Sequence, residues 1–250
     1  MGAEIPLLCV FAFFAGMVDA VAGGGGLIQV PALFALLPGS SPAVLLGTNK
    51  LSSIAGTATA VIRYARSVMI PWRTLWTVAL VALCASAVGA WTVTRVPAEI
   101  FKPIGLLLLV FVALYTARRG RAVVEKSASR LRPPLERLFS AAVGFYDGLL
   151  GPGAGSFFTF GYARWFGRDF LQAAATAKLL NLATNAGALI LFVALDSVDY
   201  RIALPMMVAN VLGAYVGASL AVTNGAKFVR KIFLIVVWAL IAKLAIDLLR

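Results

Sequence analysis

Four ionisable side chains lie inside otherwise apolar stretches, and they form two matched pairs. Asp19 corresponds to Asp147 and Lys50 corresponds to Lys178, because the members of each pair are 128 positions apart. A charge at the centre of a bilayer costs at least about 2.5 to 3.5 kcal/mol, so such residues normally face a polar cavity or an opposite charge. We expect the lysines to bind an anion and the aspartates to orient them or to carry a coupling proton. In the alternative, the aspartate and lysine of each half only neutralise one another.

A glycine-rich break follows each aspartate. The glycines of these breaks are Gly23, Gly24, Gly25 and Gly26 after Asp19, and Gly151, Gly153 and Gly155 after Asp147. Such runs weaken a helix, and a short helix that begins after the turn has free backbone N–H groups and a dipole that favour an anion. Interrupted apolar segments at corresponding positions of two halves are typical of the substrate site of a transporter.

Polar side chains near the same segments complete the predicted substrate site. They are Thr48, Asn49, Ser156, Thr176 and Asn181, with Gln29 and Asn185 as further polar neighbours. Each of them alone also suits a helix–helix hydrogen bond. No catalytic residue, metal ligand or cofactor is expected, because the chain has no histidine and only two cysteines, which we expect to be small buried side chains.

The composition indicates an all-α polytopic membrane protein. Hydrophobic residues make up 61% of the 250 residues and charged residues only 13%, whereas soluble domains average about half and a quarter. Several apolar runs reach the roughly 18 to 20 residues that span a bilayer as helix. The net charge of +12 is concentrated in one linker and near helix ends, which is typical of topology signals and lipid-headgroup contacts rather than of nucleic-acid binding.

The chain reads as a duplicated unit. We predict a first membrane repeat over 1–117, a basic cytoplasmic linker over 118–137 and a second membrane repeat over 138–250. The first segment of each repeat is broken by its glycines, and three further helices follow it. The predicted segments are 5–37, 43–62, 75–94 and 103–117 in the first repeat, and 138–160, 173–195, 204–222 and 228–249 in the second.

The distribution of lysine and arginine favours inverted halves. If each broken segment crosses the membrane, the flanks outside hold seven basic residues and the cytoplasmic ones five, apart from the linker. If each broken segment is a re-entrant hairpin that returns to its own side, the cytoplasmic flanks hold eight and the outside four. Only the second count obeys the positive-inside rule. We therefore expect inverted repeats with glycine-tipped hairpins, with parallel halves as the alternative.

Three runs together resemble the sulfite exporter TauE/SafE family. They are Ala20 to Pro31, Gly47 to Leu51 and Gly144 to Phe157, and the likeness extends over essentially the whole chain. The resemblance implies a duplicated four-segment repeat, a multi-pass protein of the bacterial inner membrane, and export of sulfur-containing anions such as sulfite or sulfonates. The second half has Pro152 in place of Gly24 and Ala177 in place of Asn49, so the two half-sites are not equivalent.

These observations predict a secondary transporter that exports a small anion by alternating access, and not an enzyme. No nucleotide-binding motif is present, so an ion or substrate gradient would supply the energy. The expected partners are a small anionic substrate, the lipid bilayer and a coupling ion such as the proton, with no nucleic acid. The alternatives are a passive anion channel and a membrane subunit or assembly factor of a sulfur-metabolism complex. Cargo, direction, coupling ion and oligomeric state are left open.

Overall fold

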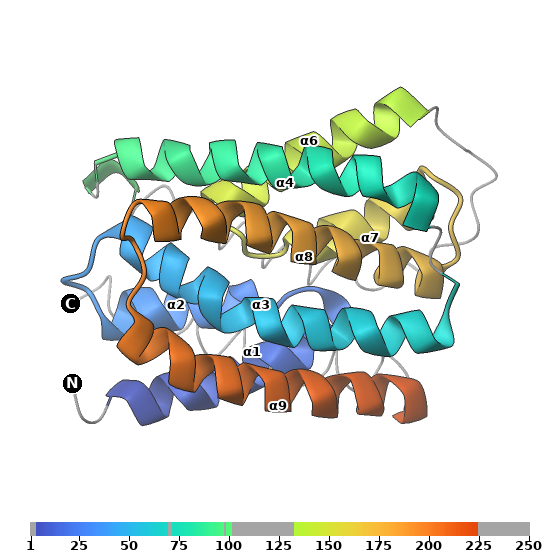
Figure 1. The fold of residues 1–250 in the computed structure, drawn as a ribbon. Helices are drawn as coiled ribbons and strands as arrows, with labels where there is room; N and C mark the ends of the chain where they lie inside the picture. The colour runs from blue at the N-terminus through green and yellow to red at the C-terminus, as the bar shows by residue number, and fades with distance from the viewer. Residues whose placement is uncertain (1–3, 70–71, 98, 102–132, 225–250) are drawn as a thin grey trace.

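The computed structural model describes residues 4–69, 72–97, 99–101 and 133–224, and within them the chain forms helices and no strands. The helices are α1 (Glu4–Ala22), α2 (Gly26–Leu36), α3 (Pro42–Ser67), α4 (Trp72–Arg95), α6 (Pro133–Leu149), α7 (Ala154–Arg164), α8 (Phe170–Ala194) and α9 (Tyr200–Asn224). The predicted segments 103–117 and 228–249 lie outside the described residues. The bundle runs lengthwise across Figure 1.

Both glycine runs end one helix and begin another. Gly23 and Gly151 adopt positive φ angles of 72° and 92°, which residues with a side chain rarely adopt. The chain turns at these two points, between α1 and α2 and between α6 and α7. Pro31 lies inside α2 and does not end it. α6 begins at Pro133, so the last five residues of the predicted 118–137 linker already belong to a helix.

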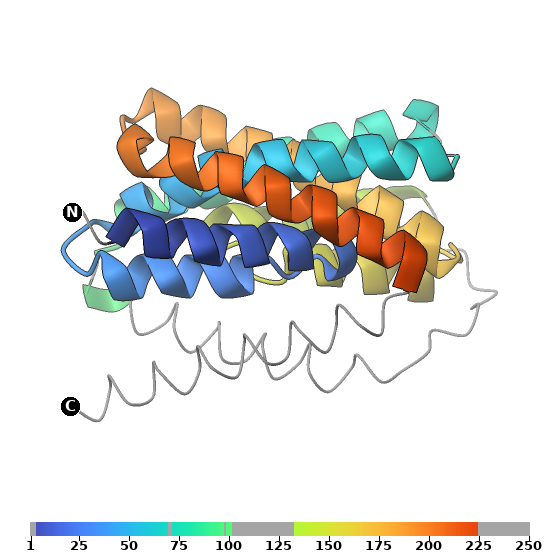
Figure 2. The ribbon, with the colours of Figure 1, turned by 90° about the horizontal axis from the view of Figure 1, so that it is seen from below.

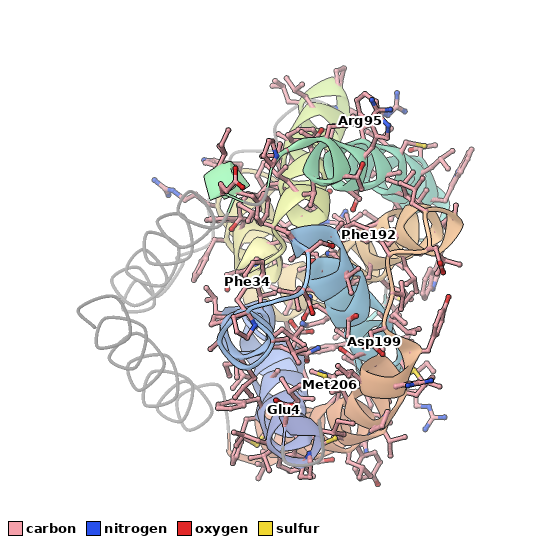
Figure 3. All side chains as sticks on the ribbon, turned by 90° about the vertical axis from the view of Figure 1, so that its left-hand side faces the viewer. Glu4, Phe34, Arg95, Phe192, Asp199 and Met206 are labelled. Carbon is pink, nitrogen blue, oxygen red and sulfur yellow. The ribbon has the colours of Figure 1, made fainter. Side chains whose placement is uncertain are left out.

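The two helix pairs enter the bundle from opposite ends. α1 and α2 lie side by side between the left-hand end of the bundle and its middle, whereas α6 and α7 come from the right-hand end (Figures 1 and 2). Figure 3 looks onto the left-hand end of the bundle, where both Glu4, at the start of α1, and Phe34, near the end of α2, are found. α3 and α8 also run in opposite directions (Figure 1). Each glycine turn therefore lies in the interior of the bundle.

Helices of the first half pack tightly on helices of the second. In α1, a Cβ at Gly16 would clash with the backbone oxygen of Asn210 in α9, and the corresponding Gly144 in α6 meets the backbone of Ala82 in α4. Glycine at such contacts lets helix backbones approach closely, which is how membrane helices commonly associate. The packing of α1 on α9 thus matches that of α6 on α4 at the 128-residue offset.

Within the described part of the chain, three helices are long and apolar enough to cross a membrane. They are the stretches Leu75–Arg95, Leu171–Ala194 and Tyr200–Leu220. Their outward faces carry large exposed apolar side chains, of which Trp76 is 62% exposed and Val208 60%. Cys84, expected to be buried, is also exposed, because it lies on this outer face of α4. Outward apolar faces of this extent suit a lipid environment.

Candidate functional site

Lys50 on α3 forms a buried ion pair with Asp147 on α6. The Lys50 Nζ lies 3.0 Å from Asp147 Oδ1, and the two side chains are only 2% and 6% exposed. The same Nζ donates a 3.0 Å hydrogen bond to Asn185 Oδ1, and Thr184 donates to the other carboxylate oxygen of Asp147. Buried charges are tolerated when they are paired and hydrogen-bonded, and this pair meets both conditions.

Lys178 on α8 forms the corresponding pair with Asp19 on α1. The Lys178 Nζ lies 2.9 Å from Asp19 Oδ2, but Asp19 is 22% exposed where Asp147 is 6%. Asp19 Oδ1 also accepts a 3.4 Å hydrogen bond from the backbone N–H of Gly25, immediately before α2. The Asp19 carboxylate therefore lies between an ammonium group and the start of a short helix, both of which attract negative charge.

Both ion pairs join one half of the chain to the other. Lys50 and Asp19 belong to the first half, and each finds its partner in the second half. The alternative in which each half neutralises itself is therefore not the arrangement seen. Substituting one residue of a pair leaves a buried charge in the opposite half without its partner.

The two glycine turns meet in the centre of the bundle. A Cβ at Gly23 would lie 2.5 Å from the backbone carbon of Gly155, and a Cβ at Gly26 would lie 3.1 Å from Pro152 Cα. Gly151 is close to the first ion pair, since a Cβ there would be 3.4 Å from Asp147 Oδ1 and 3.5 Å from Lys50 Nζ. Glycine at these positions lets the two turns and the charged groups share one small region.

A polar cavity of about 40 Å³ lies at this meeting point. That is enough for a few water molecules or a small part of a solute. Its walls come from both glycine turns and from α1, α2, α3, α6, α7, α8 and α9. The lining residues are Asp19, Gly23, Gly25, Gly26, Gln29, Asn49, Lys50, Ser53, Thr57, Asp147, Gly151, Gly155, Asn181, Asn185 and Asn210.

Most of the residues predicted for the site line this cavity. Ten do so: Asp19, Gly23, Gly25, Gly26, Asn49, Lys50, Asp147, Gly151, Gly155 and Asn181. Lys178 is joined to it through its ion pair with Asp19. Gly24, Gly153, Thr48, Ser156 and Thr176 are not among the lining residues.

The two threonines that were predicted to bind substrate, Thr48 and Thr176, form hydrogen bonds with other groups of the protein. Thr48 Oγ1 accepts a hydrogen bond from the backbone N–H of Asp199, next to the start of α9. Thr176 Oγ1 accepts one from the Arg168 guanidinium, in the segment between α7 and α8. Both threonines therefore tie a loop to a helix. Gly153, with φ of 80°, precedes the first residue of α7 and shapes the turn.

Three residues that line the cavity were not predicted from the sequence: Ser53, Thr57 and Asn210. The repeat could have identified the first two. Ser53 corresponds to Asn181, and Thr57 corresponds to Asn185, at the same 128-residue offset. They follow Lys50 by three and seven positions, which places them on one face of α3. Asn210 has alanine at its corresponding position, so the repeat gives no sign of it.

Asn210 takes part in a buried network beside the cavity. Its amide donates to Gln29 Oε1 at 3.1 Å and to the backbone oxygen of Ala12 at 3.2 Å. Gln29 in turn donates to the Ser52 hydroxyl. This network links α1, α2, α3 and α9 and fixes the wall of the cavity on the side of α1 and α2.

The sequence matches one protein family over nearly its full length. The model of the family described as Sulfite exporter TauE/SafE matches residues 8–244. A protein of Sinorhizobium sp. named Probable membrane transporter protein ORF9 is 36% identical over 97% of this chain and 93% of its own length. Probable membrane transporter proteins of Haemophilus influenzae and Escherichia coli K12 are 34% and 35% identical, over 96% and 97% of this chain and 94% and 91% of their own. No solved structure matches.

Proposed function

The chain belongs to the sulfite exporter TauE/SafE family of membrane transporters, and on this basis we propose that it is a secondary transporter of a small anion. The anion binds in the central cavity, between Lys50 and Lys178. Because the chain belongs to this family, sulfur oxyanions and sulfonates are the first cargo to test. For the same reason, we propose export as the direction of transport and the bacterial inner membrane as the location.

One observation supports an anion most strongly: two carboxylates already lie where an anion would bind. Asp19 contacts both the Lys178 ammonium and the Gly25 N–H, and Asp147 contacts the Lys50 ammonium. Each aspartate therefore occupies a position that suits the anionic group of a substrate. A substrate carboxylate, sulfonate or hydrogen sulfite group also carries one negative charge and can accept hydrogen bonds from the same ammonium and N–H donors as the aspartate that it replaces.

The charge balance of the site explains how transport can be coupled to protons. Two lysines and two aspartates give the site no net charge, so an added anion would leave it negative. Protonation of one aspartate releases its lysine and restores neutrality once the anion binds. Asp19 is the more exposed of the two aspartates, so a proton from solution reaches it more readily. One proton and one anion would then move together.

We propose further that the two halves are inverted repeats and that α1–α2 and α6–α7 are re-entrant hairpins. In support, the hairpins enter from opposite ends and meet by their glycine turns (Figure 1). The charges agree: Arg63, Arg66, Arg164 and Arg168 lie near one end, and Arg95 and Arg201 near the other, beside Asp196 and Asp199. By the positive-inside rule, the arginine-rich end is cytoplasmic. Inverted halves around a central site are the usual basis of alternating access.

The test is flux in proteoliposomes. Purified protein is reconstituted with labelled sulfite or ethanesulfonate inside, and efflux is measured with and without an opposing gradient of unlabelled anion. A carrier gives saturable flux and exchange, and the proposed coupling makes net flux follow an imposed pH gradient. Flux that neither saturates nor exchanges would identify a passive channel. No flux for any anion, combined with stable co-purification with a sulfur-metabolism enzyme, would favour an assembly factor.

A further inference from the structure

Two buried carbonyl oxygens in the cavity have no hydrogen-bond partner among the residues that the structure describes. They are Oδ1 of Asn49 and Oδ1 of Asn181, in side chains that are only 5% and 6% exposed. Both residues line the central cavity, together with Lys50. Leaving a buried acceptor unpaired is costly, so such groups in a native protein call for an explanation.

The geometry around Asn181 fixes which end of its amide is available. Its Nδ2 packs against Gly155, where an added Cβ would be only 2.5 Å away. The nitrogen is therefore turned to the second glycine turn, and the oxygen is the atom left for a ligand. Asn49 directly precedes Lys50 on α3, and both residues line the cavity.

The cavity thus offers both donors and acceptors. A lysine ammonium has three N–H donors, and the described contacts of Lys50 use two of them, on Asp147 and Asn185. The remaining donor suits an anionic oxygen, whereas the two asparagine oxygens require an N–H or O–H. A fully deprotonated anion without a donor satisfies only the first half of this set.

From this complement we infer that the substrate is a small anion that itself carries an O–H or N–H group, and that Asn49 and Asn181 select for it. The inference deepens the proposed function and rests on it. Fitting ligands are a hydrogen oxyanion, a hydroxy acid, or a hydroxy- or amino-substituted sulfonate. A site built to hydrogen-bond a substrate hydroxyl rejects the analogue without it, because its own groups are then left unpaired.

The two asparagines also mark where the halves differ. At the 128-residue offset, Asn49 corresponds to Ala177 and Asn181 corresponds to Ser53. The lysines and aspartates that hold the anion are duplicated, but the acceptors for the donor group are not. This asymmetry gives a bound anion one preferred orientation in an otherwise matched pair of half-sites.

The test compares anions that differ by one hydroxyl group. Binding of acetate and glycolate, and of ethanesulfonate and 2-hydroxyethanesulfonate, is measured by calorimetry on the purified full-length protein. We expect the hydroxylated member of each pair to bind at least about tenfold more tightly. The variants are Asn49→Ala and Asn181→Ser, which copy the residue of the other half. Thr92→Val on the outer face of α4 is the control.

Each result has a distinct meaning. A preference in the wild type that falls to about twofold or less in Asn49→Ala or Asn181→Ser, with binding of the unsubstituted anion retained, supports the inference. Equal affinity for both members in the wild type overturns it but leaves anion transport standing. A preference that persists in both variants overturns the assignment to these asparagines. Should a variant fail to fold, the wild-type ratio still decides. If the wild type binds neither member of either pair, the result refutes the proposed function itself.

Discussion

Replacing Asp147 with alanine tests the ion pair that joins the two halves. The Lys50 ammonium, 2% exposed, would lose its only carboxylate partner among the described residues and keep the Asn185 oxygen. Breaking a buried ion pair in this way costs about 3 to 5 kcal/mol, because an uncompensated charge stays behind. For a chain of this length, that corresponds to a fall in melting temperature of about 6 to 20 °C.

The second pair provides a built-in comparison. Asp19→Ala leaves the Lys178 ammonium near a position that is 22% exposed, so water can solvate part of the charge. We expect a smaller loss of about 1 to 2 kcal/mol. The order of the two effects follows from the burial of the two carboxylates alone.

A double-mutant cycle then identifies the partners. Lys50→Met combined with Asp147→Leu removes both charges, and its stability should return to near that of the wild type. Equilibrium unfolding in mixed detergent micelles should give a coupling free energy of about 2 to 3 kcal/mol between positions 50 and 147, and near zero between 50 and 19. Coupling of Lys50 with Asp19 instead would refute the cross-half pairing, because it would place each charge pair within its own half.

Three further predictions follow from the turns and the hairpins. Gly23→Ala should cost more stability than Gly151→Ala in unfolding experiments, by about 1 to 3 kcal/mol, because both lose a positive-φ glycine but only the first also meets the opposite turn; equal losses would argue against contact between the turns. Asp19→Asn should flatten the pH dependence of anion flux if Asp19 carries the proton, and an unchanged profile would confine it to a structural role. In a cysteine-free background, single cysteines at Ser40 and Ser67 should label from opposite sides of the membrane, with the latter cytoplasmic, and labelling from the same side would exclude the proposed topology.

Much of the helix pattern is predictable because apolar runs and glycine breaks act locally. The turn at Gly23 and its counterpart at Gly151 follow from the need for a positive φ angle. Pro31 is an exception to such local rules, because it lies inside α2 without ending the helix, although it removes one backbone N–H. The helix ends differ from the predicted segment ends by a few residues, because polar and apolar residues are mixed there.

The partners of the charged residues could not be predicted. A repeat in the sequence indicates that Lys50 and Lys178 are equivalent, but it does not say whether each pairs within its half or across. That choice depends on how α3 packs on α6 and how α8 packs on α1, which is a matter of tertiary packing. The role of Asn210 could not be predicted either, because the corresponding position in the first half is an alanine.

The most direct test of the central claim is whether small anions bind at the paired lysines. Thermal stability of the purified protein is measured with sulfite, thiosulfate, sulfonates, sulfate and carboxylates, for the wild type and for two charge-neutral double variants, Lys50→Met/Asp147→Leu and Lys178→Met/Asp19→Leu. An anion at 100 times its dissociation constant should add about 2.7 kcal/mol, or about 5 to 10 °C. The account predicts this shift for the wild type and its loss in both folded variants. An equal shift in all three proteins would contradict it.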